Sequence, residues 1–244
     1  MLVIDKKFTG TGEKLIKDFL QSFQKEFEKF VINYAEHSVE DQELEHIFWF
    51  SEQQVKTAVT CALNKPCNGY FMQEPGVLRK IHTKKEKKKE YKNGRADYWC
   101  RFGDKTRLSI LIEVKHHWIN LYKNHNFTFY KIAQERHIKA IEQIKNIEKN
   151  DYNIDNLFGT VLTILPIFTR YNSNDEDPLI INNNSIQEIC EKMIGKAKSN
   201  ACGGFVIPKK FQTITSFFDD TEKEKFQSFP GVIMLWTLYK FTRR

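Results

Sequence analysis

GRADYWCRFGDKTRLSILIEVKHHW, residues 94–118, decides the fold of this chain and directs the search for its chemistry. It contains two expected strands, at 95–102 and 107–115, joined by a turn. Side chains two apart in a strand point to the same face, so Glu113 and Lys115 point together while Val114 points into the opposite layer. A hairpin of the two strands would bring Asp97, in the first strand, alongside them.

Three charged side chains are unexpected in so apolar a pair of strands. Burial of a charge is costly unless the group is paired or bound to a metal ion. We therefore interpret Asp97, Glu113 and Lys115 as functional residues. A lysine between two carboxylates also suits a purely structural ion pair, and that alternative stays open.

The segments around this stretch predict an α/β protein. Hydrophobic periodicity predicts helices at 11–36, 39–64, 128–149 and 185–198, and apolar or alternating runs predict strands at 68–75, 159–169 and 231–239. This order favours a mixed central sheet flanked by helices. We expect an N-terminal helical extension at 1–38 and a main domain at 39–244, with its core at about 45–170.

The helix expected at 11–36 carries a phenylalanine stripe. Phe19, Phe23, Phe27 and Phe30, then Tyr34, fall at three- and four-residue spacing with Lys and Glu between them, which predicts packing against the rest of the domain. A partner-binding face is the alternative for this stripe.

The helix expected at 128–149 follows the key strands. Its inward residues are expected to be Ile132, Ile138, Ile141 and Ile144. His137 and Lys139 are expected at the surface.

The composition is that of a folded, basic protein. Hydrophobic residues make up 41% of its 244 residues, which argues against disorder. A net charge of +7 favours a polyanionic partner, nucleic acid first and an anionic membrane second. Five cysteines without CxxC spacing indicate reduced thiols in a cytoplasmic protein, with no zinc site. We expect no signal peptide and no membrane span.

Residues 94–118 and the elements around them resemble the PD-(D/E)XK nuclease superfamily, which has the restriction-endonuclease-like fold. The core of that family is a helix, a three-strand antiparallel meander, a helix and a further strand. It carries Asp near the start of the second core strand and (D/E)-x-K at the end of the third. Asp97 matches the first position, and Glu113, Val114 and Lys115 match the triplet. Ala96 replaces the Pro of the family's name, a change that the family widely tolerates.

The resemblance implies a nuclease that hydrolyses phosphodiester bonds, of DNA in preference to RNA. It implies that Asp97 and Glu113 bind Mg²⁺ or Mn²⁺, with the backbone carbonyl of Val114 as a further ligand. Such a metal prefers oxygen ligands, acidifies bound water and neutralises charge on the phosphate. Lys115 would orient or deprotonate the attacking water.

Four more residues are candidates for the same site, each with a structural alternative. Glu52 matches a helix acid that faces the metal in many members of the family, but a helix N-terminus also favours an acid. Glu74 could face the site or belong to a turn. Gln143 resembles a helix glutamine of RecB-like nucleases, although Ile147 replaces their usual Tyr, and a solvated helix position is the alternative. Arg95 could bind phosphate or pair with a carboxylate.

Two features offer contacts to a phosphate backbone. Lys87, Lys88 and Lys89 lie in KKEKKKEYKNG, which begins at residue 84 and favours a solvated loop, with phosphate contact as the alternative. His116 follows the triplet and could approach phosphate or metal, although packing against Trp118 is the simpler interpretation.

The sequence excludes several other enzyme classes. It has no GxSxG elbow, no Walker A loop and no GxGxxG motif. We therefore expect a divalent-metal-dependent nuclease, with a homo-oligomer compatible with the sequence. The competing hypotheses are a non-catalytic nucleic-acid-binding or assembly subunit on the same fold, and an interaction protein built on the N-terminal helix.

Overall fold

The computed structural model describes residues 1–5, 13–40, 52–81, 90–103, 108–121, 127–148, 157–172, 181–212, 215–218 and 224–241. The helices are α1 (Glu13–Glu40), α2 (Glu52–Asn64), α3 (Lys131–Lys145) and α4 (Asn183–Met193). The strands are β1 (Leu2–Ile4), β2 (Phe71–Gln73), β3 (Gly76–Ile81), β4 (Glu90–Arg95), β5 (Tyr98–Phe102), β6 (Leu108–His116), β7 (Ile119–Leu121), β8 (Phe127–Phe129), β9 (Leu157–Asn172), β10 (Ala201–Val206), β11 (Thr215–Phe218) and β12 (Glu224–Lys240). None of the helices in these ranges is long and apolar enough to cross a membrane.

Ten of the described strands form one mixed sheet, and β3 and β4 form a separate two-stranded sheet. The main order is β1-β10-β12-β9-β6-β5-β2, with β11 beside β12, and with β7 beside β8 and β9. β2, β5 and β6 form an antiparallel meander, whereas β9 runs parallel to β6 after the chain has crossed through α3. The predicted mixed α/β class and the long N-terminal helix are confirmed.

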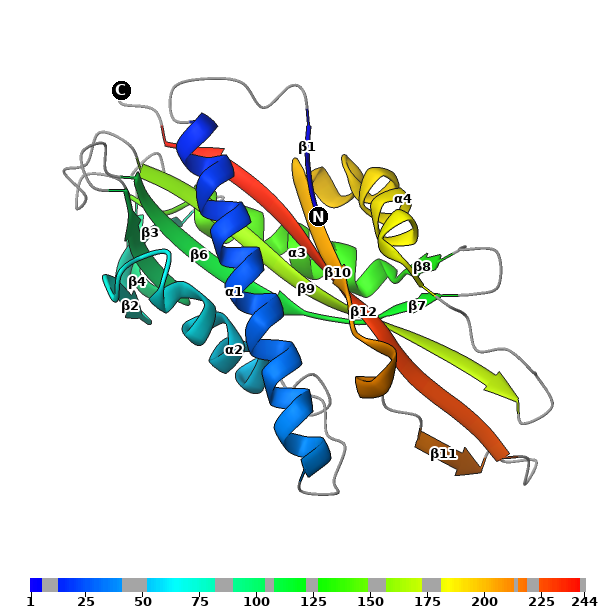
Figure 1. Cartoon of the computed structure of the whole chain (residues 1–244). Coiled ribbons are helices and arrows are strands. Elements are labelled where there is room, and N and C mark those ends of the chain that lie inside the picture. Colours follow the sequence, from blue (N-terminus) through cyan, green and yellow to red (C-terminus); the bar gives the residue numbers. More distant parts are fainter. Residues whose placement is uncertain are drawn as a thin grey trace.

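Helices cover both faces of the main sheet (Figure 1). α1 and α2 pack on the face that carries Ile112 and Val114 of β6, whereas α3 and α4 pack on the opposite face. α1 buries Phe19, Phe23 and Phe27 completely. The prediction that the phenylalanine stripe packs against the domain is therefore confirmed, and α1 lies directly on the sheet.

The expected strand at 68–75 is shorter, and an unpredicted hairpin follows it. β2 is followed at once by β3 and β4, which pair from Gly76 opposite Arg95 to Ile81 opposite Glu90. The end of the lysine-rich segment is thus strand, not loop, because residues 90–95 pair with β3. Lys87, Lys88 and Lys89 lie outside the described residues.

Two predictions about α3 are wrong. Ile132 is 59% exposed, whereas His137 is fully buried. The inward face of α3 runs through Ala133, His137, Ala140 and Ile144, and Ile132 lies about one-quarter of a turn away from it. Burial of His137 is tolerated because Nδ1 lies 2.6 Å from the Thr163 hydroxyl and Nε2 lies 2.8 Å from the Thr237 hydroxyl.

Candidate functional site

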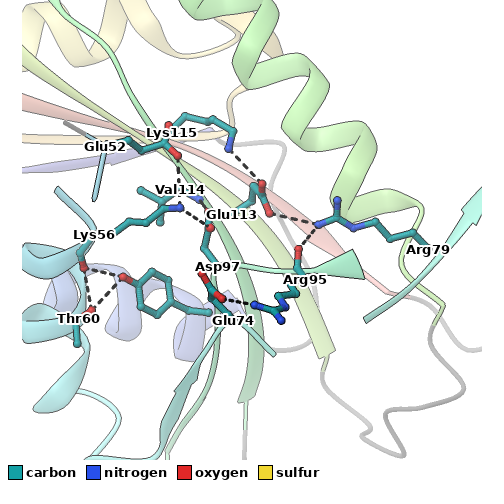
Figure 2. Close-up of polar contacts among 11 residues, drawn as sticks. Glu52, Lys56, Thr60, Glu74, Arg79, Arg95, Asp97, Glu113, Val114 and Lys115 are labelled. Atoms are coloured by element: carbon teal, nitrogen blue, oxygen red, sulfur yellow. Dashed lines mark hydrogen bonds and ion pairs between the residues drawn. The ribbon is translucent and has the colours of Figure 1, made fainter. Parts of the chain in front are cut away.

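Asp97 is held against the edge of β6, next to the Glu-Val-Lys triplet (Figure 2). It lies in a bend just before β5, not inside the strand as expected. Its backbone N–H donates to the Ile112 carbonyl at 3.1 Å. Its Oδ2 accepts a hydrogen bond of 2.7 Å from the N–H of Val114. Two bonds thus fix the Asp97 carboxylate where β5 begins to pair with β6.

Glu113 is the buried carboxylate of the site. Lys115 donates to its Oε1 at 3.2 Å, and the guanidinium of Arg79 lies 3.6 Å from its Oε2. Oε2 is buried and has no hydrogen-bond partner. Burial raises the pKa of Glu113, and the charge of Asp97 raises it further, while Lys115 and Arg79 lower it. Burial and the charge of Asp97 thus outweigh the effect of these two cations on the pKa of Glu113.

Lys56 of α2 connects Asp97 to Glu52. Its Nζ lies 2.8 Å from Oδ1 of Asp97 and 3.5 Å from Oε1 of Glu52. Burial by itself lowers the pKa of Lys56, but the hydrogen bond and charge of Asp97, with a contribution from Glu52, raise it overall. The ammonium therefore stays charged and neutralises Asp97.

The backbone of Val114 faces the same edge as Asp97. The pairing of β5 with β6 ends at Tyr98 opposite Ile112, so β5 has ended at the level of Val114. A residue in a strand points its N–H and C=O toward the same edge. Since the N–H of Val114 points to Asp97, its carbonyl points to this edge as well. The side chain of Val114 is buried in the core beneath α1 and α2.

The oxygen atoms of Asp97, Glu113 and Val114 meet some of the requirements of a hard divalent cation and fail others. The buried Oε2 of Glu113 lacks a hydrogen-bond partner, and carboxylates with a backbone carbonyl are ligands that Mg²⁺ and Mn²⁺ accept. Both oxygens of Asp97, by contrast, already have partners. Within the described ranges no group of three His, Cys, Asp or Glu side chains is gathered, so the protein ligands would be few.

The other site residues predicted from the sequence differ in how closely they are connected to Asp97 and Glu113. Glu52 reaches it through Lys56, whereas Glu74 is 64% exposed and pairs with Arg95 at 2.7 Å. The backbone N–H of Glu74 donates to the Asp97 carbonyl at 2.9 Å. Gln143 is exposed on α3.

His116 belongs to the packing around the site. Its ring lies 5.4 Å from that of Trp118, and its Nε2 is buried without a hydrogen-bond partner. Burial, with the nearby His117, lowers the pKa of His116 to about 4. The side chain is therefore neutral at pH 7 and supplies no positive charge for a phosphate.

Two cations of the site, Lys56 and Arg79, were not among the candidates from the sequence. Lys56 lies four residues after Glu52 on a predicted helix, and this spacing alone signals an ion pair with Glu52. Arg79 lies in the unpredicted strand β3 and also donates to the backbone carbonyl of Arg95. A polar cavity of about 160 Å³ lies beside Asp97 and Lys56 and includes Thr60 in its lining.

No family model matches the sequence, and no curated protein matches it. The crystal structure of SSO0001 is similar at 15% sequence identity over 64% of this chain and 75% of that chain, with a TM-score of 0.27. A similarity at this level carries no argument about fold family or function.

Proposed function

We propose that the protein is a divalent-metal-dependent nuclease that hydrolyses phosphodiester bonds, of DNA in preference to RNA. The observation that carries the proposal is the hydrogen bond from Val114 N–H to Asp97, which places one carboxylate beside the strand end that bears Glu113 and Lys115. The order of α2, β2, β5, β6, α3 and β9 follows the core that the resemblance to PD-(D/E)XK nucleases implies, and this supports the proposal.

Each side chain has a defined part in such a site. Asp97 and Glu113 would hold Mg²⁺ or Mn²⁺ together with the carbonyl of Val114. The metal would supply Lewis acidity and neutralise charge on the phosphate. Lys115 is held by Glu113, from where its ammonium can orient a water molecule and offset the charge of the phosphate. Glu113 must lose its proton to act, and because burial and the charge of Asp97 raise its pKa, it loses that proton at a higher pH than an unperturbed glutamate does.

Cleavage assays with matched variants test the proposal. Wild-type protein is expected to cleave single-stranded or duplex DNA with Mg²⁺ or Mn²⁺, and EDTA is expected to stop cleavage. Asp97→Asn, Glu113→Gln and Lys115→Met should each abolish cleavage while the proteins remain folded. Glu142→Gln alters an exposed carboxylate of α3 and should retain activity. A wild-type protein that cleaves neither DNA nor RNA with either metal would overturn the proposal.

A second function, nucleic-acid binding without cleavage, is favoured by the cations of the site. Lys56 already neutralises Asp97, and Arg79 and Lys115 already flank Glu113. Such a site resembles a closed ion-pair network, which needs no metal. Thermal unfolding with Mn²⁺ separates the two functions, since metal bound to the folded state raises the unfolding temperature. A shift that disappears in Glu113→Gln supports the nuclease, whereas nucleic-acid binding without any shift supports the second function.

A further inference from the structure

An aromatic and cationic cluster lies at the outer edge of the main sheet, outside the site described above. β2 ends the order of the main sheet and, among the described strands, pairs only with β5, with Met72 opposite Trp99. Tyr70 precedes β2, and its carbonyl accepts a hydrogen bond from the N–H of Arg101 at 3.1 Å. We call Tyr70, Met72, Trp99 and Arg101 the edge cluster. These residues alternate with Cys100 and Phe71, which pack toward the core beneath α1 and α2.

The edge cluster leaves apolar surface exposed to solvent. Tyr70 is 54% exposed and Met72 is 55% exposed, so both rank among the few large apolar side chains that the described structure does not bury. The Tyr70 and Trp99 rings lie 5.7 Å apart, tilted by 60°. Trp99 packs against the core beneath α3, which fixes its ring and gives Tyr70 a rigid neighbour.

Arg101 adds a positive charge to these rings, and no acid of the described residues neutralises it. Its guanidinium carbon lies 5.3 Å from the centre of the Tyr70 ring and 5.2 Å from that of Trp99. No carboxylate of the described residues pairs with this guanidinium, and its Nε is buried without a hydrogen-bond partner. Two rings and one guanidinium attract a ligand that combines flat π-faces with negative charge.

We propose that the edge cluster binds single-stranded nucleic acid, with a base stacked on Tyr70 and a backbone phosphate contacted by Arg101. Stacking requires the open face of a base, which a single strand offers and an intact duplex buries. The net charge of +7 favours the same partner. An apolar protein surface, which is the main alternative ligand of the edge cluster, would offer no hydrogen-bond acceptor to the guanidinium of Arg101.

The position of the edge cluster relates it to Asp97. Trp99 and Arg101 lie on β5, two and four residues after Asp97, which is about 7 and 13 Å at the usual strand rise of about 3.3 Å per residue. A strand seated on the cluster would therefore reach Asp97 within a few nucleotides. The inference rests on the proposed nuclease function, because it assigns the edge cluster to the binding of that enzyme's substrate. Binding to the edge cluster can nevertheless be measured without cleavage.

Fluorescence anisotropy in EDTA tests the edge cluster separately from the metal site. The probe is a short fluorescein-labelled DNA single strand, and a duplex of the same sequence is the comparison. Tyr70→Ala should weaken single-strand binding about fivefold or more, while Tyr70→Phe, which keeps the ring, should bind like wild type. Arg101→Gln should weaken binding and reduce the slope of log K against log salt by about 0.7. Tyr91→Ala and Arg136→Gln change an exposed tyrosine and an exposed arginine elsewhere and should leave binding within twofold of wild type.

The outcomes separate this inference from the nuclease proposal. Unchanged single-strand binding in Tyr70→Ala, equal losses for single strand and duplex, or no binding by the wild type would each overturn the edge cluster as a single-strand site. Loss of binding in Tyr70→Ala supports it whether or not the wild type cleaves DNA when metal is added. Failure of cleavage with intact single-strand binding would overturn the nuclease proposal alone.

Discussion

Lys56 Nζ lies 2.8 Å from Oδ1 of Asp97, so a lysine from α2 neutralises the carboxylate that a metal ion would need. A divalent cation that binds Asp97 must therefore compete with this ammonium. Lys56→Met is expected to lower the stability of the metal-free protein by about 1–2 kcal/mol, because a charged hydrogen bond of a largely buried carboxylate is lost. Mn²⁺ should then raise the unfolding temperature more in the variant than in wild type.

Lys65→Met is the matched control for this prediction. Lys65 also forms an ion pair at 2.8 Å, with Glu26, but lies beyond the end of α2 and away from Asp97. Its loss should leave the effect of Mn²⁺ equal to that in wild type. Equal Mn²⁺ shifts in Lys56→Met and wild type would show that the lysine and the metal do not compete.

In Arg79→Met, metal binding is expected to be lost at a higher pH than in wild type as the solution is acidified. Glu113 binds a cation only after losing its proton, and its pKa is already raised, chiefly by burial. Arg79 is one of the charges that lower this pKa, so its removal raises the pKa further. The midpoint below which Mn²⁺ no longer stabilises the protein should therefore lie at higher pH in the variant.

The measurement is the Mn²⁺-induced change in unfolding temperature across a pH series, with cleavage rates as a second reading. Arg95→Met removes an exposed arginine that pairs with Glu74, and it should leave the midpoint where wild type has it. A midpoint that stays unchanged in Arg79→Met would contradict the role given to Arg79.

The orientation of the site residues at the end of β6 can be predicted from the local sequence. Alternation along β6 is enough to predict that Val114 is buried on one face while Glu113 and Lys115 point to the other. The same rules place Asp97 close to the triplet, but not its position in a bend. That position depends on the junction of β4 and β5, where Ala96 turns into the core and is buried.

Other features depend on contacts between distant segments. β3 and β4 have polar, weakly alternating sequences, and they become strands by pairing with each other, with β4 formed by the end of the lysine-rich segment. Lys56 reaches Asp97 only because α2 packs beside β5 and β6. His137 carries no local sign of burial, since the Thr163 and Thr237 hydroxyls that bond its ring come from β9 and β12.

His137 is expected to make the protein less stable in mild acid. Burial lowers its pKa to about 4, well below the usual value near 6.5 in the unfolded chain. Because the unfolded state binds the proton first, stability is fully present above about pH 6.5 and falls as the pH drops toward 4. This histidine should cost about 2 kcal/mol of stability between pH 7 and pH 5.

Denaturant unfolding at pH 7 and pH 5 measures this loss. His137→Gln is expected to be less stable than wild type at pH 7 but to lose about 2 kcal/mol less between the two pH values. His116, whose pKa is also lowered to about 4, leaves a remaining pH dependence in both proteins. His37→Gln changes an exposed histidine of α1 and should keep the wild-type loss. An unchanged loss in His137→Gln would mean that His137 does not titrate in this range.

Phe23→Ala tests whether α1 unfolds together with the sheet or as a separate N-terminal extension. Phe23 is fully buried, and its ring lies 5.2 Å from that of Trp236 in β12 and 5.8 Å from that of Phe27. Removal of the ring should cost about 3–5 kcal/mol, since the cavity is enclosed by a helix and a sheet. In one cooperative unit the whole transition moves to lower denaturant, whether followed by Trp fluorescence or by circular dichroism. Phe30→Ala, at a half-buried position of the same helix, should cost much less. Two separate transitions in Phe23→Ala, with the sheet unfolding at the wild-type midpoint, would instead make residues 1–38 an appendage.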